Sequence, residues 1–274
     1  MTESVREEIR RFVANHPENV LPDGSGPLFD TPLMGIASFT DPLFLRYREI
    51  IGPFHLTPAE ILAGETGAGE REGSVICWVL PINEAVRASN RDETLYPSRK
   101  WSWVRHHGEV FNGRLRHHLY TWLAEQGHAT AIPQYSLLWK EFTDTPVGVA
   151  STWSERHAAY AAGLGTFSLN DGLITEKGIA HRIGSVVTRL VLPPTPRTAL
   201  DHRSNCLYYR KSGACGACIR RCPVGALTSE GHDKSICREH VYSTIPAAVA
   251  KEYNVTATGC GLCQTAVPCE FRAP

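Results

Sequence analysis

The sequence predicts a mixed α+β protein with an α/β domain over residues 1–196 and a smaller cysteine-rich domain over residues 197–274. Two apolar, β-branched runs in the first domain, Ser74–Leu80 and Ser185–Leu192, indicate buried strands that alternate with helical segments. Eight of the nine cysteines lie in the second domain. The proline-rich stretch Pro193–Pro196 separates the two parts and predicts the domain boundary.

The composition limits the classes of function that are expected of this protein. The chain has 274 residues, 42% of them hydrophobic, with 28 Lys and Arg balanced by 28 Asp and Glu. A neutral chain with this apolar content can build a core, and its net charge gives no reason to expect nucleic acid or an anionic membrane. No apolar run approaches the roughly 18–20 residues that span a bilayer. The charged, amphipathic N-terminus is not a secretory signal, so we expect a cytoplasmic protein whose thiols stay reduced.

The N-terminal third is expected to hold two helices. Val5, Ile9 and Val13 recur at helical spacing, and Pro17 follows them. Residues 18–55 are rich in Pro, Gly and Asp and are expected to be irregular. The capping box Thr57–Glu60 then starts a short helix.

A long helix is predicted to end at Gly127, with Phe111, Leu115 and Leu119 facing inward. A strand over about 129–133 follows. The outer face of this helix would carry basic and histidine side chains, expected to be solvated or, alternatively, to meet a phosphate-bearing ligand or an acidic partner: Arg114, Arg116, His117 and His118.

A second capping box, Thr152–Glu155, predicts a helix that ends at Gly163. The glycine-rich stretch after it allows a ligand to approach the backbone closely, but it lacks the sequence of a phosphate loop. Cys77 lies inside the first apolar strand, where we expect a buried small side chain rather than a ligand.

The cysteines of the second domain have the spacing of iron–sulfur ligands. Bacterial two-cluster ferredoxins use the run C-x2-C-x2-C-x3-C-P, in which the fourth cysteine crosses to the other cluster. Cys215, Cys218 and Cys222, followed by proline, match the last three positions of that run. Ser212 stands at the first position, so Cys206 is expected to supply the missing thiolate.

Cys260 and Cys263 form a further C-x2-C pair. Because the fourth cysteine of the ferredoxin run crosses to the other cluster, we expect two 4Fe-4S clusters, one held by a first set and one by a second set of four cysteines. The first set is Cys206, Cys215, Cys218 and Cys269, and the second set is Cys222, Cys237, Cys260 and Cys263. Zinc and disulfides are the rival interpretations, since C-x2-C pairs also bind zinc, but the cysteine–proline run favours iron–sulfur.

With these residues in place, the sequence resembles epoxyqueuosine reductase and, more distantly, the reductive dehalogenases. The resemblance runs from about Ser74 to Cys269 and is most specific at Glu155-Arg156, at Ala162–Gly165 and across the cysteines. It implies a nitroreductase-like α/β domain, followed by a two-cluster ferredoxin-like domain, with base-off cobalamin between them. The cofactor-binding residues that it implies are Glu155, Arg156, Gly163, Gly165 and Gly172.

The sequence departs from that family at the expected proton donor. The family places an aspartate about six residues before the Glu-Arg pair, where this chain has Val149. Tyr135, Asp144 and Tyr160 are therefore the candidates for a catalytic acid. The chain ends at Pro274, so we expect neither the helical-repeat tail that helps those enzymes hold tRNA nor, at the N-terminus, a twin-arginine signal.

The leading interpretation is an oxidoreductase in which electrons pass from a donor, such as a flavodoxin or a ferredoxin reductase system, through both clusters. They would reach cobalamin or a small-molecule substrate, which the sequence does not identify, in the first domain. The alternative is a non-catalytic, ferredoxin-type electron-transfer protein whose first domain docks a partner. Nucleic acid is not expected as a partner.

Overall fold

The computed structural model describes every residue except 68, 70 and 211–213. A four-stranded antiparallel sheet lies at its centre, with the order β1-β2-β8-β3. Its strands are β1 (Leu33–Ser38), β2 (Ser74–Pro81), β8 (His181–Thr188) and β3 (Thr130–Ala131). The central strand β2 is buried along its whole length, as its apolar sequence predicts.

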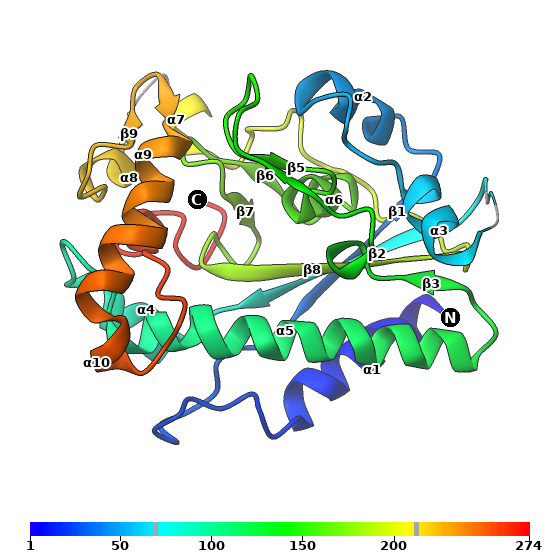
Figure 1. Cartoon of the computed structure of the whole chain (residues 1–274), viewed down its shortest axis with the longest axis horizontal. Helices are drawn as coiled ribbons and strands as arrows, with labels where there is room; N and C mark the ends of the chain where they lie inside the picture. The colour runs from blue at the N-terminus through cyan, green and yellow to red at the C-terminus, as the bar shows by residue number, and fades with distance from the viewer. Residues whose placement is uncertain (68, 70, 211–213) are drawn as a thin grey trace.

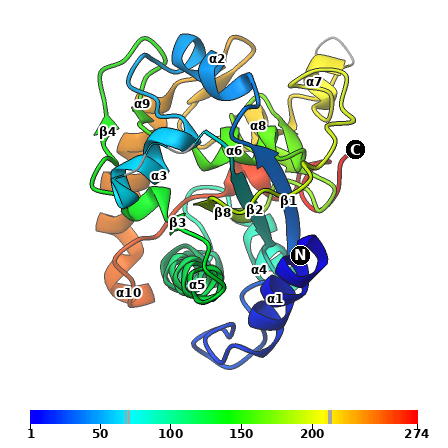
Figure 2. The same cartoon turned by 90° about the vertical axis from the view of Figure 1, so that its right-hand side faces the viewer.

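Helices cover both faces of this sheet (Figure 2). On one face lie α1 (Thr2–Asn15) and α5 (Arg99–Glu125), and on the other lie α2 (Leu43–Ile50), α3 (Pro58–Thr66) and α6 (Glu155–Ala161). Alternate side chains of β2 separate the two cores, because successive residues of a strand point to opposite faces. Ile76 and Trp78 pack toward α1 and α5, whereas Val75 and Cys77 pack toward α2, α3 and α6. Cys77 is buried, as expected.

The expected N-terminal helix and the first capping box are confirmed as α1 and α3, where the Thr57 and Glu60 side chains bond reciprocally. The expectation of irregular chain over residues 18–55 is wrong, because β1 and α2 form there. Pairing of all six β1 residues with β2 stabilises that strand despite its glycine and its turn-rich surroundings. Such tertiary pairing overrides local propensity.

Two helix starts also differ from the sequence prediction. A separate helix α4 (Glu84–Arg91) forms, and α5 already begins at Arg99, where the Ser98 hydroxyl caps it. The second capping box does not form: α6 begins at Glu155 without a side-chain cap. The Thr152 hydroxyl instead accepts from the Lys140 amide and donates to the Leu138 carbonyl.

The glycine-rich stretch is a short hairpin of β6 (Gly165–Phe167) and β7 (Leu173–Thr175). It shares a small core with the cysteine-rich part of the chain, to which Cys206 and Val267 contribute. A further hairpin, β4 (Glu141–Phe142) and β5 (Ala150–Ser151), precedes α6. The segment after β8 stays close to the sheet, since Thr195 bonds twice to Ile36 of β1. The division at residues 196 and 197 stays a prediction.

The cysteine-rich part contains short elements and one longer helical segment (Figure 1). The short elements are α7 (Leu207–Arg210), α8 (Ala217–Arg220), β9 (Leu227–Thr228), β10 (Gly231–His232) and η4 (Leu262–Gln264). The helical segment runs through α9 (Lys234–Glu239), η2 (His240–Thr244), η3 (Pro246–Ala250) and α10 (Lys251–Tyr253). Its middle is π-helical around Pro246, which lacks the amide that a regular α-helix would use.

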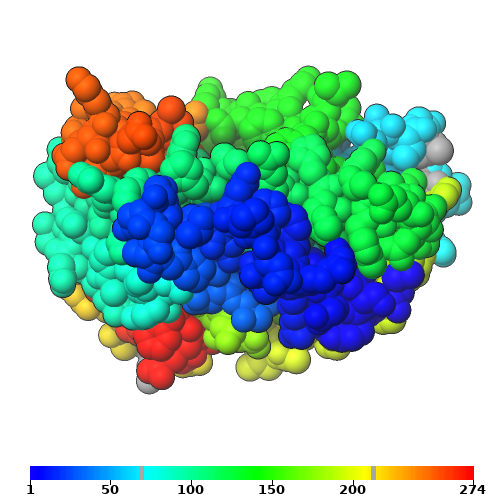
Figure 3. Space-filling view, turned by 90° about the horizontal axis from the view of Figure 1, so that it is seen from below, coloured from blue at the N-terminus to red at the C-terminus, as the bar shows by residue number. Residues whose placement is uncertain are grey.

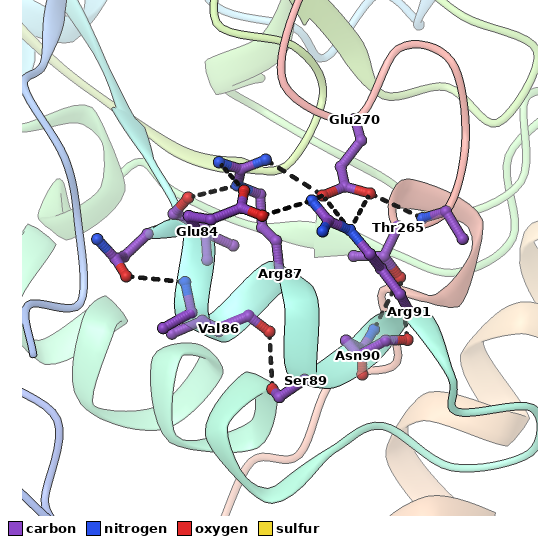
Figure 4. A network of polar contacts seen from close by, with 12 residues as sticks. Glu84, Val86, Arg87, Ser89, Asn90, Arg91, Thr265 and Glu270 are labelled. Carbon is purple, nitrogen blue, oxygen red and sulfur yellow. Dashed lines mark hydrogen bonds and ion pairs between the residues drawn. The ribbon is translucent and has the colours of Figure 1, made fainter. Parts of the chain in front are cut away.

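The last residues are joined to α4 by a buried carboxylate (Figure 4). Glu270 lies 2.7 Å from Arg91 and 3.1 Å from Arg87, and it accepts from the Ala266 amide at 2.8 Å. The N-terminal segment lies across the lower face of the molecule (Figure 3). Within the described part of the chain, no helix combines the length and the apolar character needed to cross a membrane.

Candidate functional site

The structure brings the first set of cysteines to one small cavity. All four side chains line it: Cys206, Cys215, Cys218 and Cys269. Cys206 directly precedes α7, Cys218 lies in α8, and the C-terminal segment contributes Cys269. The position of Ser212 lies outside the described residues, and the replacement of this ligand by Cys206 stays a prediction.

The second set lines a larger cavity of about 560 Å³. Its members come from four places in the chain, after α8, in α9, and before and within η4: Cys222, Cys237, Cys260 and Cys263. The same cavity is lined by side chains of α5, α6 and β8. The second set therefore lies between the cysteine-rich part and the sheet, whereas the first set does not share this cavity.

Electrostatics support the same grouping. Burial, together with the neighbouring cysteines of the first set, raises the pKa of Cys269 to about 12 and that of Cys218 to about 11. In the second set, burial and the nearby Cys237 and Cys222 raise the pKa of Cys260 to about 11. Crowded thiolates need a positively charged group among them, and a bound metal deprotonates such thiols.

These residues fit iron–sulfur ligation. All nine cysteines are free thiols. Among the residues that the structure describes, no three His, Cys, Asp or Glu side chains meet at the spacing of a single metal ion. Partly buried thiols grouped in fours, each group around one cavity, are the donor set that a 4Fe-4S cluster requires. The assignment of individual ligands stays a prediction.

Gly261 shapes the loop between two second-set cysteines. Its φ of +69° is left-handed, and a Cβ atom there would lie 1.9 Å from Cε2 of Trp101. Both the backbone angle and the close approach of the indole therefore require glycine.

We expect Gly261→Ala to destabilise the protein by about 3 kcal/mol or more and to reduce its iron content, because strain and overpacking add. Gly127→Ala is the matched control, since Gly127 is also left-handed, at φ +83°, but has open space around it. It should cost about 1–2 kcal/mol. Thermal unfolding and iron assays of both variants measure the difference, and equal losses would contradict the role of Trp101.

A charge network forms the opposite wall of the larger cavity. Arg116 Nη1 lies 2.9 Å from Oε1 of Glu109, and Arg182 Nε donates to Oε2 of Glu109 at 3.0 Å. Burial alone would raise the pKa of Glu109, but Arg182 and Arg116 outweigh it and lower this pKa to about 2. Glu109 is therefore an ionised carboxylate held between two arginines.

Glu155 lies beside this network in a different environment. Its Oε1 atom is 3.5 Å from Nη2 of Arg116, and its Oε2 atom has no hydrogen-bond partner among the described residues. Burial raises the pKa of Glu155, against the opposing charge of Arg116. Other buried atoms without a described partner belong to residues that line the same cavity: Arg116 Nε, His181 Nδ1, and His240 Nδ1 and Nε2. Buried polar atoms ordinarily have a partner. These atoms have almost no accessible surface, so they lie within the wall of the cavity and do not open into it.

The predicted cofactor residues divide between two cavities. Glu155, Arg156 and Gly172 line the cavity of the second set. Gly163 and Gly165 line a separate cavity of about 520 Å³.

The three candidate acids are not brought to the larger cavity. Tyr160 lines the separate cavity with Gly163. Tyr135 is half exposed and stacks on His117, while Asp144 is exposed.

The prediction that the basic side chains of α5 are solvated is wrong for Arg116. Its side chain is 2% exposed, because α5 packs along β8 and Arg116 donates to the Ile183 carbonyl there. Arg114 and His118 face Glu18 and Glu8 near the N-terminus instead of a ligand.

The sequence interpretation missed Glu109, Arg182 and His240. One signal was available: Glu109 and Arg116 are seven residues apart, which places these two opposite charges on one helix face. Arg182 and His240 meet the pair only through the tertiary fold.

Known proteins resemble this chain in sequence and in fold. It is 30% identical over 139 residues to epoxyqueuosine reductase of Gloeobacter violaceus, a match covering 48% of the chain but only 39% of that relative. The whole chain has the fold of epoxyqueuosine reductase from Streptococcus thermophilus, with a TM-score of 0.54, 14% identity, and coverage of 100% of this chain and 68% of that one. No family model matches the chain.

Two further solved structures have the same fold. A selenomethionine-labelled epoxyqueuosine reductase matches with a TM-score of 0.53 and 18% identity, over 98% of this chain and 66% of that one. A catabolic reductive dehalogenase matches with a TM-score of 0.52 and 12% identity, over 98% of this chain and 36% of that one. The resemblance expected from the sequence is therefore confirmed: the chain is related in sequence to epoxyqueuosine reductase and shares the fold of that enzyme and of reductive dehalogenase.

Proposed function

We propose that this chain is an iron–sulfur oxidoreductase that holds one 4Fe-4S cluster in the first set of cysteines and one in the second. The observation that supports it most is that each set of four thiols lines its own cavity. Such clusters, when bound, supply one-electron transfer at a potential tuned by charge, burial and hydrogen bonds to sulfur. The two sets are neighbours, since the charge of Cys218 raises the pKa of Cys263.

The surroundings suggest a direction for the electrons. Exposed arginines surround the first set: the Cys206 backbone bonds with those of Arg203 and Arg210, and Arg220 donates to the Cys215 carbonyl. Such a surface suits an acidic one-electron donor of the flavodoxin type. The second set shares its cavity with the charge network, so we propose that the acceptor is reduced there.

Cobalamin is the acceptor that the resemblance indicates. Glu155, Arg156 and Gly172 line the cavity, and its volume lies in the range of small-molecule sites, about 300–1,000 Å³. Gly163 and Gly165 lie at the other cavity, so only part of the implied site supports this assignment.

Anaerobic purification after expression with added cobalamin tests these proposals together. Iron, sulfide and cobalt are measured, and an absorption spectrum is recorded. We expect about eight irons and one cobalt per chain. About eight irons without cobalt would keep the clusters and remove cobalamin, whereas a colourless or zinc-containing protein would overturn the redox function.

The second candidate function is that of a non-catalytic electron-transfer protein, and the positions of the candidate catalytic acids favour it. Val149 stands at the position of the expected aspartate, and both Tyr135 and Asp144 are solvent-exposed rather than at the cavity. Redox titration combined with turnover assays separates the two functions. A carrier cycles its clusters with a reduced donor but reduces no small molecule.

A further inference from the structure

We propose that the larger cavity binds small organic anions, molecules that carry a carboxylate or phosphate group, and that Arg105 holds this group. This inference rests on the proposed function and deepens it, because it names the class of small molecule that comes next to the second set of cysteines. Three features of the cavity support it: an arginine without a partner, an excess of positive charge, and an apolar wall for the rest of the molecule.

The first feature is the position of Arg105, which lies half-buried between α5 and the second set. Its stem packs over Gly259, since a Cβ atom added at Gly259 would lie 3.1 Å from Cγ of Arg105. Gly259 directly precedes Cys260, and Arg105 and Cys260 both line the cavity. A ligand bound to Arg105 would therefore lie in the cavity that the second set shares.

The guanidinium group of Arg105 has no hydrogen bond or ion pair with any residue that the structure describes. A partner on its own helix would be Glu109, four residues further along the same face, but Arg116 and Arg182 occupy both oxygens of that carboxylate. The nitrogens of Arg105 are not among the buried atoms that lack a partner, so they have accessible surface, whereas Nε of Arg116 is enclosed in the wall. A guanidinium group offers five N–H donors and can bind two oxygens of a carboxylate or phosphate in parallel.

The second feature is the charge of the cavity wall. Four arginines and two glutamates line it: Arg105, Arg116, Arg156, Arg182, Glu109 and Glu155. Asp171, whose carbonyl oxygen accepts from Arg156, adds a third carboxylate nearby, which still leaves one arginine without a counter-charge. Burial lowers the pKa of Arg182, Glu109 opposes this effect, and the charge of Arg105 adds to it, so the guanidinium groups of Arg105 and Arg182 are close enough to repel each other. An anion bound beside both would offset this repulsion.

The third feature is the apolar part of the wall. Leu173, Ile179 and Ile183 line the cavity from β7, from the turn after it and from β8. Ligand sites are commonly apolar with a few polar groups that fix the orientation of the ligand, and the volume of about 560 Å³ lies in their range. An organic anion would place its charged end on Arg105 and its apolar part against these side chains.

The separate cavity fits such a ligand less well. Arg6, Arg10 and Arg197 line it, but Arg6 and Arg197 are already paired with carboxylates. Glu176 lines the same cavity and balances the charge of Arg10. No excess of positive charge is left there to hold an anion.

Arg105 has one rival role, which concerns the second set itself. A cluster bound there would bring negative charge, and an arginine beside Cys260 would offset it and tune the cluster potential. In that case the cavity needs no anion, and replacing Arg105 would not change anion binding. The experiment therefore measures anion binding directly instead of the activity of the loaded protein.

The test is anaerobic titration calorimetry of the iron-loaded chain, expressed without cobalamin and kept at low ionic strength. The probes are succinate, inorganic phosphate and, as a neutral analogue, succinamide. The wild type should bind succinate or phosphate but not succinamide, and the tighter of the two anions distinguishes a carboxylate ligand from a phosphate ester. Arg105→Gln should weaken this binding about tenfold or more, because it removes charge-assisted hydrogen bonds.

Two further variants sharpen the comparison. Arg105→Lys should keep part of the affinity, since lysine retains the charge but not the paired N–H donors. Arg114→Gln is the matched control: Arg114 lies on the same helix but pairs with Glu18 and does not line the cavity, so its replacement should leave anion binding unchanged.

Failure of the wild type to bind either anion would overturn the inference, as would equal binding by the wild type and Arg105→Gln. Should Arg105→Gln fail to fold, the wild type is treated with phenylglyoxal, a reagent for accessible arginines, and its peptides are weighed by mass spectrometry. Arg105 must then be modified, and succinate or phosphate must protect it. The iron assay of the same sample reports separately on the proposed function. Clusters without anion binding would remove this site alone, whereas anion binding by a protein that holds no iron would remove the redox function alone.

Discussion

Replacing Cys263 by serine is expected to halve the iron content of the anaerobically purified protein, from about eight to about four irons per chain. Cys263 is buried between the other members of the second set, and their charges and that of Cys218 all act on its thiol. Serine lacks the soft thiolate that iron of a cluster prefers. The electron paramagnetic resonance signal of one reduced cluster should disappear with it.

Cys77→Ala is the matched control. Cys77 is fully buried in the core between the sheet and α2, α3 and α6, and it lines neither cavity. It should keep all of the iron and sulfide. Equal iron in Cys263→Ser and the wild type, or a comparable loss in Cys77→Ala, would contradict the two-set assignment. Cys206→Ser should remove the other half of the iron if Cys206 replaces the ligand expected at position 212.

Glu270→Gln is expected to destabilise the protein strongly, lowering the free energy of unfolding by about 2–4 kcal/mol. Its carboxylate is 3% exposed and faces Arg87 and Arg91 together (Figure 4). A neutral amide leaves two guanidinium groups of α4 without their buried counter-charge. Chemical denaturation of the cluster-loaded protein measures the loss.

Glu84 provides the control for this prediction. It pairs with the same two arginines, Arg87 and Arg91, but its side chain is 56% exposed. Exposed ion pairs contribute little, so Glu84→Gln should cost less than about 1 kcal/mol. Equal effects of the two substitutions would show that burial of Glu270 is not what matters.

The same carboxylate predicts a dependence of stability on pH. Burial would raise the pKa of Glu270, but the hydrogen bonds with Arg91 and the Ala266 amide, together with the charges of Arg91 and Arg87, outweigh burial, and the pKa is lower than that of an ordinary glutamate. A group whose pKa is lower in the folded state stabilises the fold above its unfolded pKa of about 4.3. This contribution should therefore be lost as the pH falls below about 4, and Glu270→Gln should remove that part of the acid transition.

Local sequence patterns predicted how the cysteines of this protein are grouped. Their spacing divides the thiols into two sets of four, and each set lines one cavity. The capping box at Thr57 and the buried strand at Ser74–Leu80 also depend on neighbours a few residues away, and both are present. Such features can be predicted because their physical causes lie within a short segment of chain.

The site around Glu155 could not be predicted in the same way. Arg116 looked like part of a solvated face, and the acid was sought at Tyr135, Asp144 and Tyr160. Whether a charged side chain is solvated depends on what packs over it, and α5 lies against β8, some 70 residues further along the chain.

The sequence by itself therefore determined the donor atoms, their grouping and the family resemblance, since these follow from residue type and short spacing. Only the tertiary structure decided which cysteines share a cavity with Arg116 and Glu155, and that Arg116 is buried there. The physical reason is burial: a charged side chain is hydrated on an isolated helix but loses that water when distant segments of the chain pack over it.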